Sequence, residues 1–442
     1  MKSKTFKLRS NLSIESQSQL GQKLNISHVA NSAVLLPLKA DRPLIQSLPL
    51  AQCEVCVIVP VRNEAQLLEA CLSALANQVD LQGRALDFRR YEVILLANNC
   101  SDDSVAIAQR FSQLHPEFRL HIIELVLPPV AAYIGRVRQL LMDEAYHRLA
   151  SLGLANSGSK AGIIASTDGD TQVAPTWIAA TLLEISRGVD AVGGRIIADP
   201  VSCEALDPQV KLRYLRGDRY HQLVVELETY LDPNPHDRWP RHAQHYGASL
   251  AVTAQMYASA GGMPAVRTPE DVAFYRSLQR VGARFRHSPL VAVTTSARQT
   301  VRTEGGFAAQ LNQWATMGQD RVFLVESAVA IESRFQARRR LRQIWREMLN
   351  GYRHTIADVT SLANTLGVCK RWLWTELTQP QSFELLFERI EVLQQQDECQ
   401  QRSPLVDLEQ AIDDLSTRLQ SLRPLHQPDT LEAEFINQPQ WQ

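Results

Sequence analysis

Between about residues 51 and 190, short apolar runs alternate with segments whose apolar residues recur at helical spacing. Strands that alternate with helices through short links are typical of a mostly parallel sheet covered by helices on both faces. The pattern therefore predicts an α/β fold for this part of the chain. The expected strands span residues 53–60, 91–97, 119–127, 162–167 and 189–197, and the expected helices span residues 65–77, 103–114, 131–150 and 175–187.

Candidate binding residues, most of them polar, lie where three of the expected strands end. Ligands of mostly parallel sheets bind at the carboxyl ends of the strands. These residues are therefore candidates for one shared binding site. They are Pro60, Arg62 and Glu64 after the first strand, Asn99 and Asp102 after the second, and Asp168 and Asp170 after the fourth.

Asp168-Gly169-Asp170 is the most informative of these segments. In an extended segment, carboxylates two positions apart point to the same side, and the glycine between them lets a ligand approach the backbone. Two hard oxygen ligands suit Mg²⁺ or Mn²⁺ that carries a substrate diphosphate. The motif predicts a divalent-metal site, although an acidic turn after a strand has the same composition.

Composition narrows the classes of protein that this chain can form. Of its 442 residues, 45% are apolar and 21% charged, enough for one large domain with an appendage. The formal net charge is −1, so no global field would attract nucleic acid. The longest apolar stretch, at 120–133, is interrupted and too short to span a bilayer. The first residues contain no apolar signal-peptide core, which predicts a cytoplasmic location.

The cysteines are seven in number and scattered, as expected of a reduced chain. Cys53 and Cys56 form a CxxC pair inside the first expected strand, where odd spacing predicts that their side chains lie on opposite faces. No second pair accompanies them. The pattern therefore disfavours a metal or redox site at this pair.

Five motifs together resemble those of the family 2 glycosyltransferases, and the resemblance covers about residues 53–310 in the family's order. They are VIVPVRNE at 57–64, similar to the family's VxVPxxNE; EVILLANNCSDD at 92–103, similar to its nucleotide-contacting strand and turn; the Asp-Gly-Asp in place of its DxD; GASLAV at 247–252; and GGMP at 261–264, followed by PED at 269–271.

The resemblance implies a GT-A-like sheet, a UDP- or GDP-linked sugar donor, and Mg²⁺ or Mn²⁺ held by Asp168 and Asp170. It also implies inversion at the sugar, with Asp271 as the base. A carboxylate near the acceptor hydroxyl can take its proton as the oxygen attacks the sugar, an effect of ~10²–10⁴-fold. As an alternative, Thr268-Pro269-Glu270-Asp271 fits a capping box with proline at the first helical position.

On the donor side, the resemblance implies that a basic helix start containing Arg136 and Arg138 faces the diphosphate, and that Arg298, in a TSxR-like stretch, lies near it. Bidentate guanidinium groups suit phosphate. The hydroxyl-bearing acceptor is not identified by any motif. The expected donor-binding residues are Pro60, Arg62, Glu64, Asn99, Asp102, Arg136, Arg138, Asp168 and Arg298.

Several donor-site residues also have a structural interpretation. Glu64 could stabilise a helix N-terminus, residues 101–104 fit an ordinary N-cap, and Arg136 and Arg138 could be solvated helix residues. The turn after the second strand departs from the family, because Asn98 and Asn99 stand where an acid is common. The sequence therefore does not identify the base of the nucleotide.

Other functions compete with this one. A retaining GT-A synthase of a small glycoside would share the fold. A nucleotidyltransferase would need a Gly-rich basic loop after the first strand, where residues 62–66 read RNEAQ. A degenerate, membrane-surface scaffold is disfavoured by the intact acids. A polymerising synthase is also disfavoured, because Gln313 replaces the arginine of QxxRW.

The expected domains are a partly disordered leader at 1–50, the GT-A domain at 51–315 and a helical region at 316–442. Arg334, Arg338, Arg342 and Arg346 recur every four residues in that last region, with Arg339 beside them. This basic face could bind anionic lipid peripherally, or it could be a solvated face packed on the catalytic domain.

Overall fold

Contacts within the computed structural model divide the chain into two units. The first, called the α/β unit here, comprises Glu15–Lys211 and Gln244–Thr316, and the second, the helical unit, comprises Met1–Ile14, Leu212–Ala243 and Met317–Gln442. The leader expected at 1–50 lies mostly outside the described residues, and the expected domain boundaries stay predictions. The structure describes residues 6–7, 43–155, 161–298, 306–316, 323–379, 381–396 and 405–423.

The α/β unit contains an eight-stranded sheet with the order β4-β3-β2-β5-β8-β7-β9-β6. The pairs β4–β3, β3–β2, β2–β5 and β7–β9 are parallel, whereas β8 and β6 pair antiparallel with their neighbours. The expected mostly parallel α/β sheet is therefore confirmed. The strands are β2 Val55–Val61, β3 Tyr91–Asn98, β4 Leu120–Leu125, β5 Ile163–Ser166, β6 Thr171–Val173, β7 Ala191–Ala198, β8 Leu250–Thr253 and β9 Phe285–Thr295.

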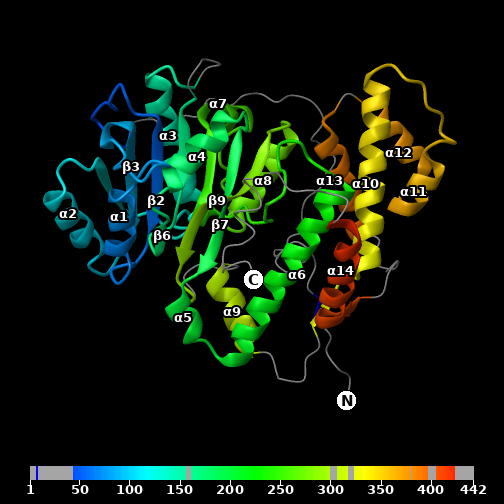
Figure 1. Cartoon of the computed structure of the whole chain (residues 1–442). Coiled ribbons are helices and arrows are strands. Elements are labelled where there is room, and N and C mark those ends of the chain that lie inside the picture. The colour runs from blue at the N-terminus through cyan, green and yellow to red at the C-terminus, as the bar shows by residue number, and fades with distance from the viewer. Residues whose placement is uncertain are drawn as a thin grey trace. The chain divides into compact units, whose positions relative to one another are not determined.

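Helices cover both faces of this sheet (Figure 1). All seven residues of β2 are buried, and they alternate between two apolar clusters: Val57 and Val59 belong to one, and Cys56 and Ile58 to the other. The first cluster includes residues of α1, α2 and α4, and the second includes residues of α3, α7 and α8. The helices of this unit are α1 Leu68–Ala76, α2 Ser104–Leu114, α3 Ile134–Ser151, α4 Trp177–Ser186, α5 Pro200–Glu204, α7 Ala254–Ser259, α8 Glu270–Arg280 and α9 Phe307–Thr316, with 3₁₀ turns at Phe88–Arg90 and Gly247–Ser249.

The helical unit confirms the expected helical C-terminal region. Residues of α10 pack with α11, α12 and α13 around an apolar cluster that includes Leu341, Leu373 and Leu386. A short three-stranded sheet has the order β1-β10-β11. The elements are α10 Ala328–Leu349, α11 Thr360–Leu366, α12 Lys370–Leu377, α13 Phe383–Gln396, α14 Leu408–Leu422, β1 Phe6–Lys7, β10 Phe323–Val325, β11 Val406–Asp407, and residues 212–231 of α6 (Pro208–Leu231). Among the described helices, none combines the length and apolar character that a bilayer crossing requires.

The arginine row of α10 is largely paired with acids inside the helical unit. Arg338 forms ion pairs with Glu228 and Asp232, and Arg342 pairs with Asp232. Arg334 pairs with Glu326 at 3.0 Å. Burial alone would raise the pKa of Glu228, but Arg241 and Arg338 hold that pKa below its usual range. The row therefore supplies counter-charges to Asp232, which is buried, and to Glu228 and Glu326, which are half-buried.

Gly194 on β7 tests the packing of this strand against the neighbouring β9 and against the 3₁₀ turn that precedes β8. A Cβ at Gly194 would lie 2.0 Å from Oγ of Ser249 and 2.3 Å from the carbonyl oxygen of Val291. We expect Gly194→Ala to lower stability by ~1–3 kcal/mol through overpacking. Thermal denaturation measures this loss of stability. Gly217→Ala is the control, because nothing lies within 4 Å of its Cβ position in α6, and equal melting temperatures for the two variants would contradict the prediction.

Candidate functional site

The turns that follow β2 and β3 are joined by side chains. Asp102 accepts the N–H of Ala65 at 3.0 Å through Oδ2 and the hydroxyl of Ser104 at 2.6 Å through Oδ1. Oγ of Ser104 accepts the N–H of Glu64 at 2.8 Å. Asn63, at φ 57°, accepts the N–H of Ser101 at 2.8 Å. Asp102 thus fixes the turn that presents Glu64, while its predicted contact with a nucleotide stays a prediction.

Asn99 also has a structural role at the strand ends. Its φ is 51°, a left-handed conformation that asparagine tolerates better than most residues. Its side-chain amide donates to the carbonyl oxygen of Leu127 and accepts the N–H of Leu127, both at 3.0 Å. The amide therefore holds the chain that leaves β4 beside the end of β3, and its role in base recognition stays a prediction.

Glu64, Asp170 and Arg298 meet although they come from three different parts of the unit. The Arg298 guanidinium donates to both carboxylate oxygens of Glu64 at 2.7 Å, and its Nη2 lies 2.9 Å from Oδ2 of Asp170. These residues follow β2, β5 and β9, respectively. All three residues were expected at the site, but nothing in the sequence indicates the bidentate pair between Arg298 and Glu64.

Arg138 on α3 forms the second cationic centre. Its guanidinium contacts Oδ1 of Asp168 and lies 2.5 Å from Oε1 of Glu270 and 4.0 Å from Oδ2 of Asp271. Arg138 is only 4% exposed. The arginine predicted to face a diphosphate is therefore buried against three carboxylates, and Glu270 is a site residue that the sequence analysis did not single out.

The turn from Asp168 to Asp170 differs in form from the extended segment assumed from the sequence. Strand β5 ends at Ser166, and a turn leads from it to β6. A Cβ at Gly169 would lie 3.1 Å from Cγ2 of Val61 and 3.3 Å from Cγ of Glu64. The glycine therefore lets the turn pack against the end of β2. Its two neighbouring carboxylates contact different arginines, Arg138 and Arg298.

Asp271 lies in the first turn of α8. Its Oδ2 accepts the N–H of Gly247 at 3.0 Å. The capping box expected from Thr268 is wrong: Pro269 occupies the N-cap position, and no side chain caps the helix. The reason is that the helix begins one residue later than the box requires. Burial raises the pKa of Asp271, and Arg138 opposes the increase.

Acids outnumber cations at this centre. Burial, together with repulsion from Asp168, raises the pKa of Asp170 to about 6 against the attraction of Arg298. Burial raises the pKa of Glu270 to about 7 against the attraction of Arg138. Paired carboxylates that hold raised pKa values in a buried centre favour an additional cation. Asp168 and Asp170 are hard oxygen donors, so this centre fits a divalent ion.

The other expected donor residues are Pro60, Arg62 and Arg136. Pro60 lies within β2, opposite Leu96 of β3. Arg62 is exposed, and its Nη1 donates to the carbonyl oxygen of Ala132 at 3.4 Å. Arg136 donates to Oε1 of Gln139 at 2.5 Å. Contact of these residues with a donor stays a prediction.

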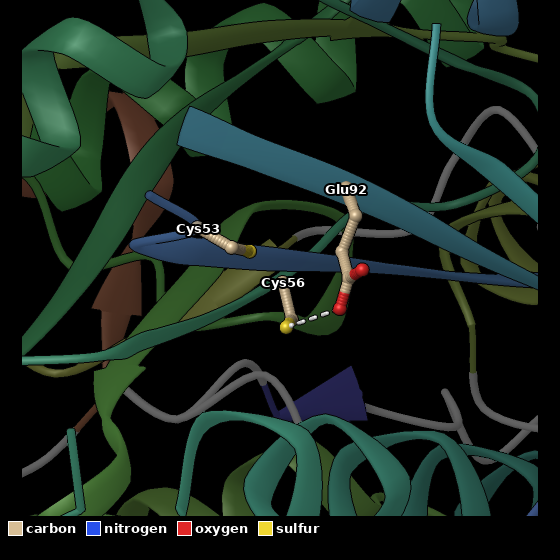
Figure 2. Close-up of side chains that lie close together, drawn as sticks. All are labelled: Cys53, Cys56 and Glu92. Atoms are coloured by element: carbon tan, nitrogen blue, oxygen red, sulfur yellow. Dashed lines mark hydrogen bonds between the residues drawn. The ribbon is translucent and has the colours of Figure 1, made fainter. Parts of the chain in front are cut away.

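Cys53, Cys56 and Glu92 form a buried cluster in which the possible ligand atoms lie within 4.8 Å of one another (Figure 2). The prediction that the two cysteines lie on opposite faces is wrong, because β2 begins at Val55 and Cys53 precedes the regular alternation. Glu92 accepts a hydrogen bond from Cys56 at 3.1 Å and two from Arg148 at 2.6 and 2.7 Å. Because Arg148 already neutralises Glu92, a cation here would have to compete with it.

Part of the chain is similar in sequence to known proteins. Residues 56–228 match the family model for glycosyl transferase family 2. Glycosyltransferase AglE of Haloferax volcanii is 28% identical over 143 residues, which are 32% of this chain and 39% of that protein. The chain thus spans about two fifths of the length of this curated relative.

Solved structures with partial similarity were also found. A mannosyltransferase of Pyrobaculum calidifontis in complex with GDP-Man and Mn²⁺ has a TM-score of 0.36 at 14% identity, with 85% of this chain and 88% of that chain covered. S. aureus TarS 1–349 in complex with UDP has a TM-score of 0.39 at 12% identity, with 85% and 93% covered.

The match of residues 56–228 to the model for glycosyl transferase family 2 agrees with the family that the five motifs resemble. The α/β sheet and the helical C-terminal region agree with the GT-A-like class expected for this family. The matched segment contains the strand ends that carry Glu64, Asp168 and Asp170, whereas Asp271 and Arg298 lie beyond it.

Glu92 gives a pH test of the buried cluster. Burial alone would raise its pKa, but hydrogen bonds from Arg148 and His121 lower it from 4.5 to about 2. A lowered folded-state pKa stabilises the protein above pH 4.5, and this contribution, of roughly 3 kcal/mol, is lost as the pH falls toward 2. We therefore expect Glu92→Gln to unfold earlier in urea at pH 7 and to lose less stability on acidification.

Urea midpoints measured between pH 7 and pH 2.5 check this expectation. Glu117→Gln is the control, because Glu117 is exposed. If the urea midpoints of wild type and Glu92→Gln changed in parallel with pH, the ion pair of Glu92 and Arg148 would not contribute to stability as described.

Proposed function

We propose that the chain is a metal-dependent glycosyltransferase that moves a sugar from a UDP- or GDP-linked donor to a hydroxyl acceptor. The observation that carries the proposal is the acid cluster at the strand ends of the segment that matches glycosyl transferase family 2. Glu64, Asp168 and Asp170 form its donor side, and Asp271 forms its acceptor side. Ligands of such sheets bind at this edge.

On the donor side, Asp168 and Asp170 are the proposed ligands of Mg²⁺ or Mn²⁺. Such an ion, when bound, would stabilise the negative charge that develops on the leaving diphosphate. Arg298 contacts both Glu64 and Asp170, so its guanidinium lies at the proposed donor side. The Arg298 contacts fix the Glu64 carboxylate, which is the proposed acceptor for hydroxyl groups of the nucleoside.

On the acceptor side, Asp271 is the proposed general base. One of its oxygens takes the proton of the acceptor hydroxyl while the hydroxyl oxygen bonds to the anomeric carbon and the bond from that carbon to the diphosphate breaks. The N–H of Gly247 orients this carboxylate at 3.0 Å. Burial raises its pKa, which strengthens it as a proton acceptor. This arrangement corresponds to an inverting transfer, and proton NMR of the product anomer distinguishes inversion from retention.

Peripheral membrane contact is a separate proposal, based on the arginine row of α10. The ion pairs of Arg334, Arg338 and Arg342 reduce the charge that this row could offer to anionic lipid. Arg339 is exposed, and its Nη1 donates to the carbonyl oxygen of Leu231 at 3.4 Å. A cytoplasmic location stays a proposal from the sequence.

Asp170→Ala tests the metal site. The change removes a carboxylate from the proposed ion site, so we expect metal-dependent binding of the nucleotide to be lost. Calorimetric titration of UDP and GDP with and without Mn²⁺ measures it. Asp413→Ala is the control, because Asp413 is an exposed acid on α14. Affinity equal to wild type in Asp170→Ala would refute the proposed metal site.

Asp271→Asn separates a base from a purely structural acid. Asparagine keeps an oxygen for the N–H of Gly247 but cannot take a proton, so we expect turnover to fall ~10²-fold or more while donor affinity and melting temperature hardly change. A stabilising acid at a helix N-terminus would instead contribute ~0.3–1 kcal/mol of stability and leave turnover intact.

Single-turnover transfer and a melt of the same preparation distinguish these outcomes. Asp199→Asn is the matched control, because Asp199 caps α5 by accepting the N–H of Ser202 at 2.8 Å. That variant should lose stability without losing turnover. Near-normal turnover of folded Asp271→Asn would place the base elsewhere, and a selective loss of acceptor binding would favour a retaining enzyme.

A further inference from the structure

Arg138 connects the two sides of the proposed active site through one guanidinium group. Its Nη2 contacts Asp168, on the donor side, and its Nη1 lies 2.5 Å from Glu270 and 4.0 Å from Asp271, on the acceptor side. A planar guanidinium can contact two carboxylates in fixed directions, which a lysine ammonium cannot do. The distance between the two sides therefore depends on this side chain.

Gly247 packs directly against the guanidinium group of Arg138. A Cβ at Gly247 would lie 1.7 Å from Nη1 and 1.9 Å from Cζ of Arg138. The N–H of the same glycine donates to Asp271. Gly247 therefore packs against the guanidinium and holds the neighbouring carboxylate at the same time, and any larger residue would displace one of them.

Helix α3, which carries Arg138, is itself held close to the start of α8. A Cβ at Gly135 would lie 1.9 Å from the carbonyl oxygen of Val266 and 3.0 Å from Cβ of Glu270. Such close packing fixes where the Arg138 side chain begins. Because Arg138 is buried, solvent screens its charge little. The three neighbouring carboxylates compensate this charge.

We propose that Arg138 is a positioning residue, which fixes Asp271 relative to the metal ligand Asp168, and is not a ligand of the donor diphosphate. This inference rests on the proposed function. It has a distinctive consequence: the positive charge of Arg138 opposes the binding of a cation at Asp168, while its contacts align the acceptor side. A diphosphate ligand would instead increase donor affinity.

The two roles predict opposite results for Arg138→Gln. For a positioning residue, Mn²⁺ affinity should be equal or tighter, because a cation is removed beside Asp168, and kcat should fall ~10-fold or more, because misplacement of the reacting groups is costly. For a diphosphate ligand, donor affinity should fall while kcat at saturating donor changes little. Arg138→Lys, which keeps the charge and loses the fork, should bind Mn²⁺ like wild type and still transfer slowly.

The experiment measures Mn²⁺ and UDP or GDP binding by calorimetry, transfer by single turnover, and melting temperature for each variant of the full chain. Arg148→Lys is the matched control, because Arg148 is also buried and paired with a carboxylate, Glu92, away from this site. It should lower the melting temperature and leave kcat unchanged. The double variant Arg138→Gln/Glu270→Gln removes both charges of one pair. It should recover melting temperature relative to Arg138→Gln without recovering kcat.

Three results would overturn the inference while wild type is active: weakened Mn²⁺ affinity in Arg138→Gln, a loss confined to donor affinity, or recovery of kcat together with melting temperature in the double variant. The last would mean that Arg138 acts only through stability. A wild-type chain that neither binds Mn²⁺ nor transfers sugar would refute the proposed function itself, and the inference with it. If Arg138→Gln does not fold, Arg138→Lys and the double variant decide the question.

Discussion

The candidate site depends on several carboxylates that lie close together at the carboxyl ends of the parallel strands. Two carboxylates about 5 Å apart repel each other by roughly 3 kcal/mol at an effective dielectric constant of 20. Two guanidinium groups, those of Arg138 and Arg298, lie between the acids and offset part of this repulsion. The remaining imbalance is visible in the raised pKa values of Asp170 and Glu270, about 6 and about 7. This excess of negative charge makes the site attract cations.

The scaffold determines which acids can meet. Strands β2, β3 and β5 run parallel and in register, so the turns that follow β2 and β5 begin at the same edge of the sheet. The two arginines reach that edge from other elements: Arg138 comes from α3, and Arg298 follows β9. Asp102 and Asn99 then join neighbouring turns. The site is therefore a consequence of strand register, with side chains that hold the turns in place.

Sequence reasoning could locate the parts of the fold that depend on local pattern. The five expected strands correspond to β2, β3, β4, β5 and β7, because each is an apolar run followed by a turn. It could not find the order of β7, β8 and β9, which depends on pairings between distant segments. For the same reason, it left Asn99 and Asp102 between a contact with a nucleotide and an ordinary helix cap, and it did not predict their contacts with the neighbouring turns. The motifs identified the acids. Nothing in the sequence indicated which of these acids Arg138 and Arg298 would contact.

The arginine row of α10 shows the same limit for surface charge. Spacing of four residues correctly placed these arginines along one helix, and from that segment alone the face looked strongly basic. The acids that pair with Arg338 and Arg342 are Glu228 and Asp232, more than a hundred residues earlier in the chain. Buried carboxylates require such partners, because an unpaired charge in a low-dielectric interior is strongly destabilising. The sign of a protein surface therefore follows from which segments pack together, and a single amphipathic helix does not determine it.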